Sequence, residues 1–298
     1  MDLGPDLSDR YVVGTAIGQG GGACVYRIRR VSDDCEFAIK VSRASSLRTM
    51  GQVPREARVL AALGGICSPR LIEQGVLRDG LPYLIMELCH GEPLHRVVRH
   101  QRPSLCESLL LGARIARILA ESHNRGWLHR DVKPANVLIP IDNHGPQFAC
   151  ARLIDFGVAL QLNEDPLSGT PLTAIGEFSG TAEYMAPEQL VCRKQSTATD
   201  LYALGVVLHE LLVGVVPMHD APLHKVKRDQ GLPSVFSGPF VVRRLTEDVV
   251  LPDVGLPESV AAILSNCLSR APERRPASAI VLAEALLMVA RSIESTSL

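Results

Sequence analysis

The pattern of apolar positions divides the chain into a strand-rich first part and a helix-rich remainder. Short apolar runs predict strands at residues 11–17, 37–41 and 81–89. Apolar positions at helical spacing predict helices at residues 54–63, 105–124, 196–214 and 279–290. Gly64, Gly126 and Gly214 stand where three of these helices would end. From about residue 105 onward the predicted elements are thus mainly helices.

Composition and charge exclude several classes of protein. With 298 residues and 46% hydrophobic content, the chain can bury a large core. The 31 basic and 32 acidic residues nearly balance, so we expect neither nucleic acid nor a membrane as a partner. The first residues lack the basic and apolar regions of a signal peptide. The apolar residues 279–290 carry Glu284 and fall short of the about 20 residues that span a bilayer, which favours a buried helix.

The eight cysteines are scattered singly, without a Cys-x-x-Cys pair. This spacing favours reduced thiols that pack as small apolar side chains over disulfides or a zinc site. We therefore expect a cytoplasmic protein.

Candidate chemistry is concentrated in residues 129–139 and 155–157, each beside a short apolar run. Asp131 can accept a proton from a hydroxyl group, and Asn136 and Asp155 offer the hard oxygen ligands that Mg²⁺ prefers. Lys133 adds a positive charge near the aspartate. Together these residue types suit phosphoryl transfer, which requires an oriented hydroxyl and neutralisation of phosphate charge.

The order of these motifs resembles that of the eukaryotic-type (Hanks-type) serine/threonine protein kinase family, in the style of its bacterial members. His129, Arg130 and Asp131 with Asn136 fit the catalytic loop of that family, and residues 155–157 fit its metal-binding triplet. The resemblance implies an α+β, two-lobed protein-kinase-like fold, with a mostly β small lobe and a mostly α large lobe. The expected boundaries are a flexible lead-in at 1–10, a kinase domain at 11–290 with lobes 11–88 and 89–290, and a tail at 291–298.

The resemblance also implies ATP, together with Mg²⁺ or Mn²⁺. In the family a strand lysine contacts the phosphates and pairs with a helix glutamate, which gives these roles to Lys40 and Glu56. A family glycine is replaced here by Ala23, with Gly22 one place earlier. The residues expected to bind the nucleotide are Ile17, Gly18, Gly20, Val25, Ala38, Lys40, Met86, Glu87 and Cys89.

By the same resemblance, Asp131, Lys133 and Thr181 would face the substrate hydroxyl, and Asn136 and Asp155 would bind the metal. Residues 155–188 form a loop-like activation segment without lysine or arginine, so a phosphate within it needs a cation from elsewhere. We expect autophosphorylation at Thr170 or Thr173 and binding of that phosphate by Arg130. The expected structural residues are Asp200, which would brace the catalytic loop, and the pair Glu188 and Arg275.

Two other functions stay open. An ATP-binding pseudokinase scaffold would usually lack one of the positions named above, and none is lacking. A small-molecule phosphotransferase would share the aspartate and the metal ligands, but residues 180–188 resemble a segment shaped for peptides.

Proteins with serine or threonine are the expected partners. A transient dimer would permit trans-autophosphorylation, although no residue pattern supports it. Residues 140–148 are expected to form a surface hairpin, and residues 218–257 indicate no mechanism.

Overall fold

The structure is a computed structural model that describes residues 5–19, 22–43, 51–162, 182–218 and 239–296. Its contacts divide the chain into two compact units. The first unit contains residues up to His90 together with Ile154–Ala159, and the second contains Gly91–Leu153 and the residues from Leu160 onward. Within the described ranges, no helix is both long and apolar enough to cross a membrane.

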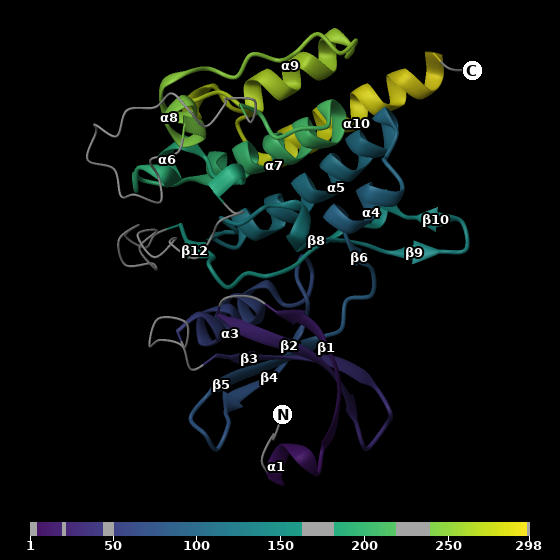
Figure 1. The fold of residues 1–298 in the computed structure, drawn as a ribbon, viewed down its shortest axis with the longest axis vertical. Coiled ribbons are helices and arrows are strands. Elements are labelled where there is room, and N and C mark those ends of the chain that lie inside the picture. Colours follow the sequence, from purple (N-terminus) through teal and green to yellow (C-terminus); the bar gives the residue numbers. More distant parts are fainter. Residues whose placement is uncertain (1–4, 20–21, 44–50, 163–181, 219–238, 297–298) are drawn as a thin grey trace. The chain divides into compact units, whose positions relative to one another are not determined.

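The first unit is built on a five-stranded antiparallel sheet in the order β1-β2-β3-β5-β4. Its strands are β1 (Tyr11–Gln19), β2 (Ala23–Arg30), β3 (Glu36–Ser42), β4 (Leu71–Val76) and β5 (Pro82–Glu87). Helix α3 (Gln52–Leu63) contacts β3, β4 and β5 (Figure 1). It ends at Gly64, which adopts the left-handed conformation and donates to the carbonyl of Leu60.

Alternation along β3 gives the sheet two different faces. Phe37, Ile39 and Val41 are buried in one apolar cluster with residues of β1, β2 and β5. Ala38 and Lys40 therefore point to the other face. Lys40 is thus the one charged residue among residues 37–41 of β3.

The lead-in expected at residues 1–10 is packed rather than flexible over its described part. Residues 5–8 form helix α1 (Pro5–Ser8), and Leu7 is only 4% exposed within the cluster that contains Tyr11. The guanidinium of Arg10 donates to both carboxylate oxygens of Glu73, at 2.8 and 2.7 Å. An apolar residue and an ion pair thus attach this segment to the sheet.

The second unit is mostly helical. Its longer helices are α4 (Leu94–His100), α5 (Leu105–Asn124), α7 (Thr197–Val213), α8 (Pro239–Thr246), α9 (Glu258–Cys267) and α10 (Ala279–Thr296) (Figure 1). Helix α5 contacts α7 and α10, and α9 contacts the same two helices. A short helix α6 (Pro187–Leu190) and 3₁₀ turns at Pro134–Asn136, Phe148–Cys150, Ala182–Tyr184 and Pro272–Arg274 complete the helical elements described.

Helix α7 is buried along nearly its whole length, as the apolar residues 196–214 predict. A side chain at Gly205 would place its Cβ 2.6 Å from that of Cys267 on α9, so glycine permits this close approach. Gly112 on α5 likewise permits the close approach of Leu208, because a side chain there would meet it. The helix ends at Gly214, which is left-handed as the sequence indicates.

Short strands position the loops of the second unit. One small sheet has the order β11 (Arg152–Leu153), β8 (Val137–Ile139), β6 (Glu92–Pro93). A second pairs β12 (Leu160–Gln161) with β7 (Trp127–Leu128), and the expected hairpin at 140–148 is present as β9 (Ile141–Asp142) and β10 (Gly145–Pro146). Strands β7 and β8 flank residues 129–136, which fixes both ends of the candidate catalytic loop.

The predicted α+β fold with a sheet-rich first part and a helical remainder is confirmed. The contacts place the division between the two units after His90, two residues from the expected lobe boundary at 88, and group Ile154–Ala159 with the first unit. Helix α10 extends to Thr296, so the described residues of the expected tail at 291–298 are helical. The expected domain bounds stay predictions.

Candidate active site

Lys40 forms an ion-paired centre within the first unit. Its Nζ lies 2.6 Å from Oε2 of Glu56 on α3 and 2.8 Å from Oδ1 of Asp155. The side chain of Lys40 is 12% exposed and that of Glu56 is 2% exposed. The predicted pair of Lys40 with Glu56 is therefore present, and Asp155 extends it.

Burial alone would lower the pKa of the Lys40 ammonium. The carboxylates of Asp155 and Glu56 outweigh burial, so its pKa is raised and the group stays charged. An ammonium has three donors, and the two carboxylates account for two of them. Lys40 thus retains one donor and the charge needed to contact a phosphate oxygen.

Asp155 has an unusual backbone conformation for a residue with a side chain, with φ of 67°. Its Oδ1 accepts from the backbone N–H of Gly157 at 3.3 Å as well as from Lys40. The side chain of Asp155 is 43% exposed. The local turn therefore presents a carboxylate that solvent can reach, as a metal ligand requires.

Sheet register brings most of the predicted nucleotide-binding residues of the first unit onto one face of the sheet. Gly18 pairs with Val25, Val25 pairs with Lys40, and Ala38 pairs with Met86. Directly paired residues of antiparallel strands share a face, so these side chains lie on the face that carries Lys40. Ile17 is exposed and Cys89 is partly exposed. The backbone N–H of Glu87 donates to the carbonyl of Arg70.

Asp131 is the centre of a second arrangement, which lies within the second unit. Its Oδ2 accepts from Nζ of Lys133 at 2.8 Å and from Nδ2 of Asn136 at 2.9 Å. Nδ2 of Asn136 also donates to the main-chain carbonyl of Asp131 at 2.9 Å. Asp131 and Asn136 are both buried. The loop thus places a carboxylate, an ammonium and an amide together.

The orientation of Asn136 fits a metal ligand. Because its amide nitrogen donates to Asp131, its carbonyl oxygen Oδ1 points away from that carboxylate. An amide oxygen of Asn136 and the accessible carboxylate of Asp155 are both hard oxygen donors, the type that Mg²⁺ and Mn²⁺ take. Each of the two residues therefore offers an oxygen of the type that such an ion takes.

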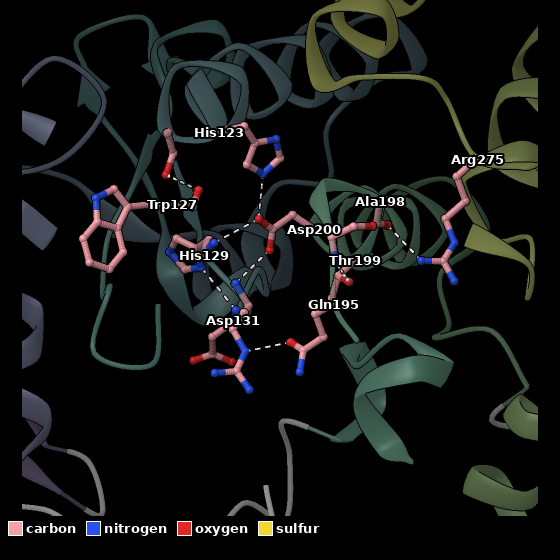
Figure 2. A network of polar contacts seen from close by, with 12 residues as sticks. His123, Trp127, His129, Asp131, Gln195, Ala198, Thr199, Asp200 and Arg275 are labelled. Atoms are coloured by element: carbon pink, nitrogen blue, oxygen red, sulfur yellow. Dashed lines mark hydrogen bonds and ion pairs between the residues drawn. The ribbon is translucent and has the colours of Figure 1, made fainter. Parts of the chain in front are cut away.

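Asp200, at the beginning of α7, holds the backbone of the candidate catalytic loop, residues 129–136. Its carboxylate accepts from the N–H groups of His129 at 2.9 Å and Arg130 at 2.7 Å, and lies 2.8 Å from Nε2 of His123 (Figure 2). Burial raises the pKa of this carboxyl group, but the contact with His123 and the backbone donors outweigh it and the pKa is lowered. The predicted bracing contact is present, and His123 adds to it.

Arg130 connects the catalytic loop to two glutamines. Its Nε donates to Oε1 of Gln195 at 2.7 Å, and its main-chain carbonyl accepts from Nε2 of Gln189 at 3.1 Å. The residue has φ of 68° and is 6% exposed. Gln189 also accepts from the N–H of Ala186 at 3.0 Å, so it bridges the end of the activation segment to the residue before Asp131.

Glu188 and Arg275 form a bidentate ion pair with N–O distances of 2.7 and 2.8 Å. The hydroxyl of Thr199 donates to the same carboxylate at 2.9 Å. Arg275 also donates to the carbonyl of Ala198 at 2.9 Å (Figure 2). The guanidinium carbon lies 4.8 Å from the centre of the Tyr202 ring. The predicted pair is thus present in a fully hydrogen-bonded setting.

Four predicted site residues lie outside the described residues: Gly20, Thr170, Thr173 and Thr181. The sequence interpretation missed His123, Gln189 and Gln195. Each reaches its partner through folding over a long sequence separation, for example from His123 to Asp200, and no motif assigned a role to any of them. The position of His123 near the end of a helix before the catalytic loop was the available signal.

Comparisons with known proteins agree with this arrangement. The family described as "Protein kinase domain" matches residues 11–287. Serine/threonine-protein kinase pkn3 of Myxococcus xanthus is 30% identical over 292 residues, which cover 93% of this chain and 49% of the relative. Serine/threonine-protein kinase pkn2 of the same organism is 33% identical over 290 residues, covering 95% of this chain and 33% of the relative.

A third relative, serine/threonine-protein kinase PknB of Mycobacterium leprae, is 29% identical over 300 residues and covers 97% of this chain. The chain spans 44% of that protein's length. Similarity to serine/threonine protein kinases thus extends over nearly the whole chain, while the chain spans half or less of these three curated relatives.

Proposed function

Because the chain belongs to the protein kinase family, we propose that it transfers the γ-phosphoryl group of ATP to serine and threonine hydroxyl groups of proteins. The observation that carries this proposal is the arrangement around Asp131, with Lys133 and Asn136 both bonded to its carboxylate. The relatives of this chain are serine/threonine-protein kinases by name, which supports the same class of substrate.

In this proposal each residue has a separate task. Asp131 orients the substrate hydroxyl and accepts its proton, and Lys133 offsets negative charge on the transferring group. Lys40, held by Glu56, contacts the phosphates of ATP. Asn136 and Asp155 would hold Mg²⁺ or Mn²⁺. The ion, when bound, supplies positive charge against the phosphate oxygens.

The pairing of Lys40 with Glu56 and Asp155 supports this assignment for the first unit. A pseudokinase scaffold would not need Lys133 and Asn136 to be oriented toward Asp131. The presence of both contacts favours catalysis over binding alone.

The test is transfer of labelled phosphate from ATP with Mg²⁺ to a generic basic protein and to the chain itself. We expect Asp131→Asn to reduce the rate at least about 100-fold, since a general base contributes roughly 10²–10⁴. ATP should still raise the melting temperature of this variant, because Asp131 does not bind the nucleotide in the proposal. Asp142→Asn, at the exposed end of β9, is the matched control and should retain full activity.

Two outcomes would contradict the proposal. Transfer that is equally fast in Asp131→Asn would remove the assigned base. Absence of transfer by the parent protein, despite a rise in melting temperature with ATP, would favour the scaffold function.

We also infer autophosphorylation of the activation segment at Thr170 or Thr173. Residues 155–188 contain no lysine or arginine, so a phosphate on either threonine would need a cation from elsewhere, and we assign that role to Arg130, which precedes Asp131. Identification of the labelled residue in the same experiment tests this inference, and label elsewhere would contradict it. A cytoplasmic location and a transient dimer stay predictions.

A further inference from the structure

Arg244 is a buried cation that no part of the proposed chemistry uses. It lies on α8 and is 1% exposed, although arginine is almost never fully buried without a specific partner. Its Nη1 donates to the main-chain carbonyls of Glu183 at 2.5 Å and Met185 at 3.0 Å. The guanidinium carbon also lies 5.5 Å from the centre of the Tyr202 ring.

These contacts join three separate elements. Arg244 belongs to α8, Tyr202 to the buried helix α7, and the two carbonyls to the 3₁₀ turn Ala182–Tyr184 and the residue after it. One side chain therefore fixes the backbone between Thr181 and Pro187. A main-chain carbonyl bonded to a charged donor is held more strongly than one bonded to a neutral donor.

The same short segment has two further attachments. The hydroxyl of Tyr184 donates to Oε2 of Glu210 at 2.7 Å, and the N–H of Ala186 donates to Oε1 of Gln189. Gln189 in turn donates to the carbonyl of Arg130, which precedes Asp131. The segment that Arg244 holds is thus linked through one glutamine to the catalytic loop.

We propose that Arg244 is a positioning residue for the protein substrate, which fixes the backbone of residues 183–185 relative to the catalytic loop. This inference rests on the proposed function, because it assigns to that segment the binding of the polypeptide that Asp131 phosphorylates. Arg244 contacts neither ATP nor the reacting atoms. Its removal should therefore weaken binding of the protein substrate while leaving ATP binding unchanged.

A set of three variants tests this prediction. Arg244→Met keeps much of the apolar stem but removes the donors, and Arg244→Lys keeps the charge but not the planar fork of donors. Arg243→Met is the matched control. Arg243 is the neighbouring arginine on α8, and its contact with Glu247 is an exposed i,i+4 pair that contributes little.

Steady-state kinetics with a protein substrate are the first readout. We expect Arg244→Met to raise KM for that substrate about tenfold or more, the effect of losing one or two hydrogen bonds from a charged donor. KM for ATP should stay within about twofold of the parent value. Arg244→Lys should lie between the parent and Arg244→Met, and Arg243→Met should match the parent.

Hydrogen exchange of residues 182–190 is the second readout and needs no activity. Arg244→Met should accelerate exchange in this segment without accelerating it in α5, and Arg243→Met should change neither. A parent protein that transfers no phosphate would overturn the proposed function, whereas unchanged exchange would overturn the anchoring of the segment by Arg244. An active parent with unchanged substrate KM in Arg244→Met, or a general loss of structure in both Arg244 variants, would overturn the positioning role.

Discussion

At the scale of single residues, the pair of Glu188 and Arg275 shows why losing one partner of a buried ion pair destabilises the fold. Arg275 has 0% and Glu188 7% of its side chain exposed, and both carboxylate oxygens accept from the guanidinium. Removal of one partner leaves the other charge buried without compensation. The contribution of the pair therefore depends on both residues being present together.

We expect Glu188→Ala and Arg275→Ala each to lower the free energy of unfolding by about 3–5 kcal/mol. The double variant should cost less than the sum, with a coupling of at least about 1 kcal/mol, because it leaves no lone charge. Urea unfolding at constant m value measures these differences. The exposed pair of Arg27 and Glu36 is the control, and its single variants should cost about 1 kcal/mol or less. Single variants of the buried pair that cost no more than this control would refute the argument.

At the scale of secondary-structure elements, the end of α7 contains a group that links stability to pH. His209 is 2% exposed, and its Nδ1 lies 2.8 Å from the carbonyl of Val215, just beyond the end of the helix. Burial lowers the pKa of His209 below its ordinary value, and the charge of Arg244 lowers it further. The hydrogen bond with the Val215 carbonyl raises the pKa, but this effect is the smaller one and the pKa stays lowered.

The direction of the pH effect follows from proton uptake. In the unfolded chain a histidine binds a proton below about pH 6.5, whereas folded His209 does so only at a lower pH. The unfolded state thus binds more protons in that range, so the free energy of unfolding falls as pH decreases below about 6.5. We expect His209→Gln to flatten the dependence of the melting temperature on pH between about 5 and 6.5. An equal slope in the parent and His209→Gln would contradict the assignment.

Elements with local signals could be predicted from the sequence. Residues 105–124 are helical as expected, with Ser104 and Glu107 forming a capping box, and α7 begins and ends at the predicted cap residues. The short strands β6, β7 and β12 could not be predicted, because pairs such as Leu160 with Leu128 form only after folding. Helix α1 was missed since its stability depends on burial of Leu7.

The candidate site likewise contains residues that the sequence indicates and residues that only the structure reveals. Lys40, Glu56, Asp131, Asn136 and Asp155 stand in ordered motifs, so the sequence indicates them directly. The positions of Gln189, Gln195 and Arg244 depend on side chains that approach across long separations, and no spacing rule reveals such contacts. Motifs therefore identify the reacting groups, whereas tertiary structure is needed to identify the residues that hold them.

At the scale of the whole molecule, the first unit is not continuous in sequence. Residues Ile154–Ala159 belong to it, although more than sixty residues of the second unit separate them from His90. This segment contributes Asp155, which pairs with Lys40, and Phe156, which is fully buried. The chain must therefore leave the first unit and return to it before Lys40 acquires both of its carboxylate partners.

This discontinuity predicts that residues 1–90 do not form a stable domain alone. Without Asp155 the buried Lys40 keeps only Glu56, and the loss of a buried phenylalanine side chain typically costs about 3–5 kcal/mol. Since domains are stable by only about 5–15 kcal/mol, we expect the isolated fragment to lack a cooperative thermal transition in circular dichroism. The full chain with Phe156→Ala is the control, and its melting temperature should fall while the transition remains cooperative. A cooperative transition of the fragment at the temperature of the full chain would show that the sheet and α3 suffice. Ile154–Ala159 would then contact the first unit without being needed for the stability of that unit.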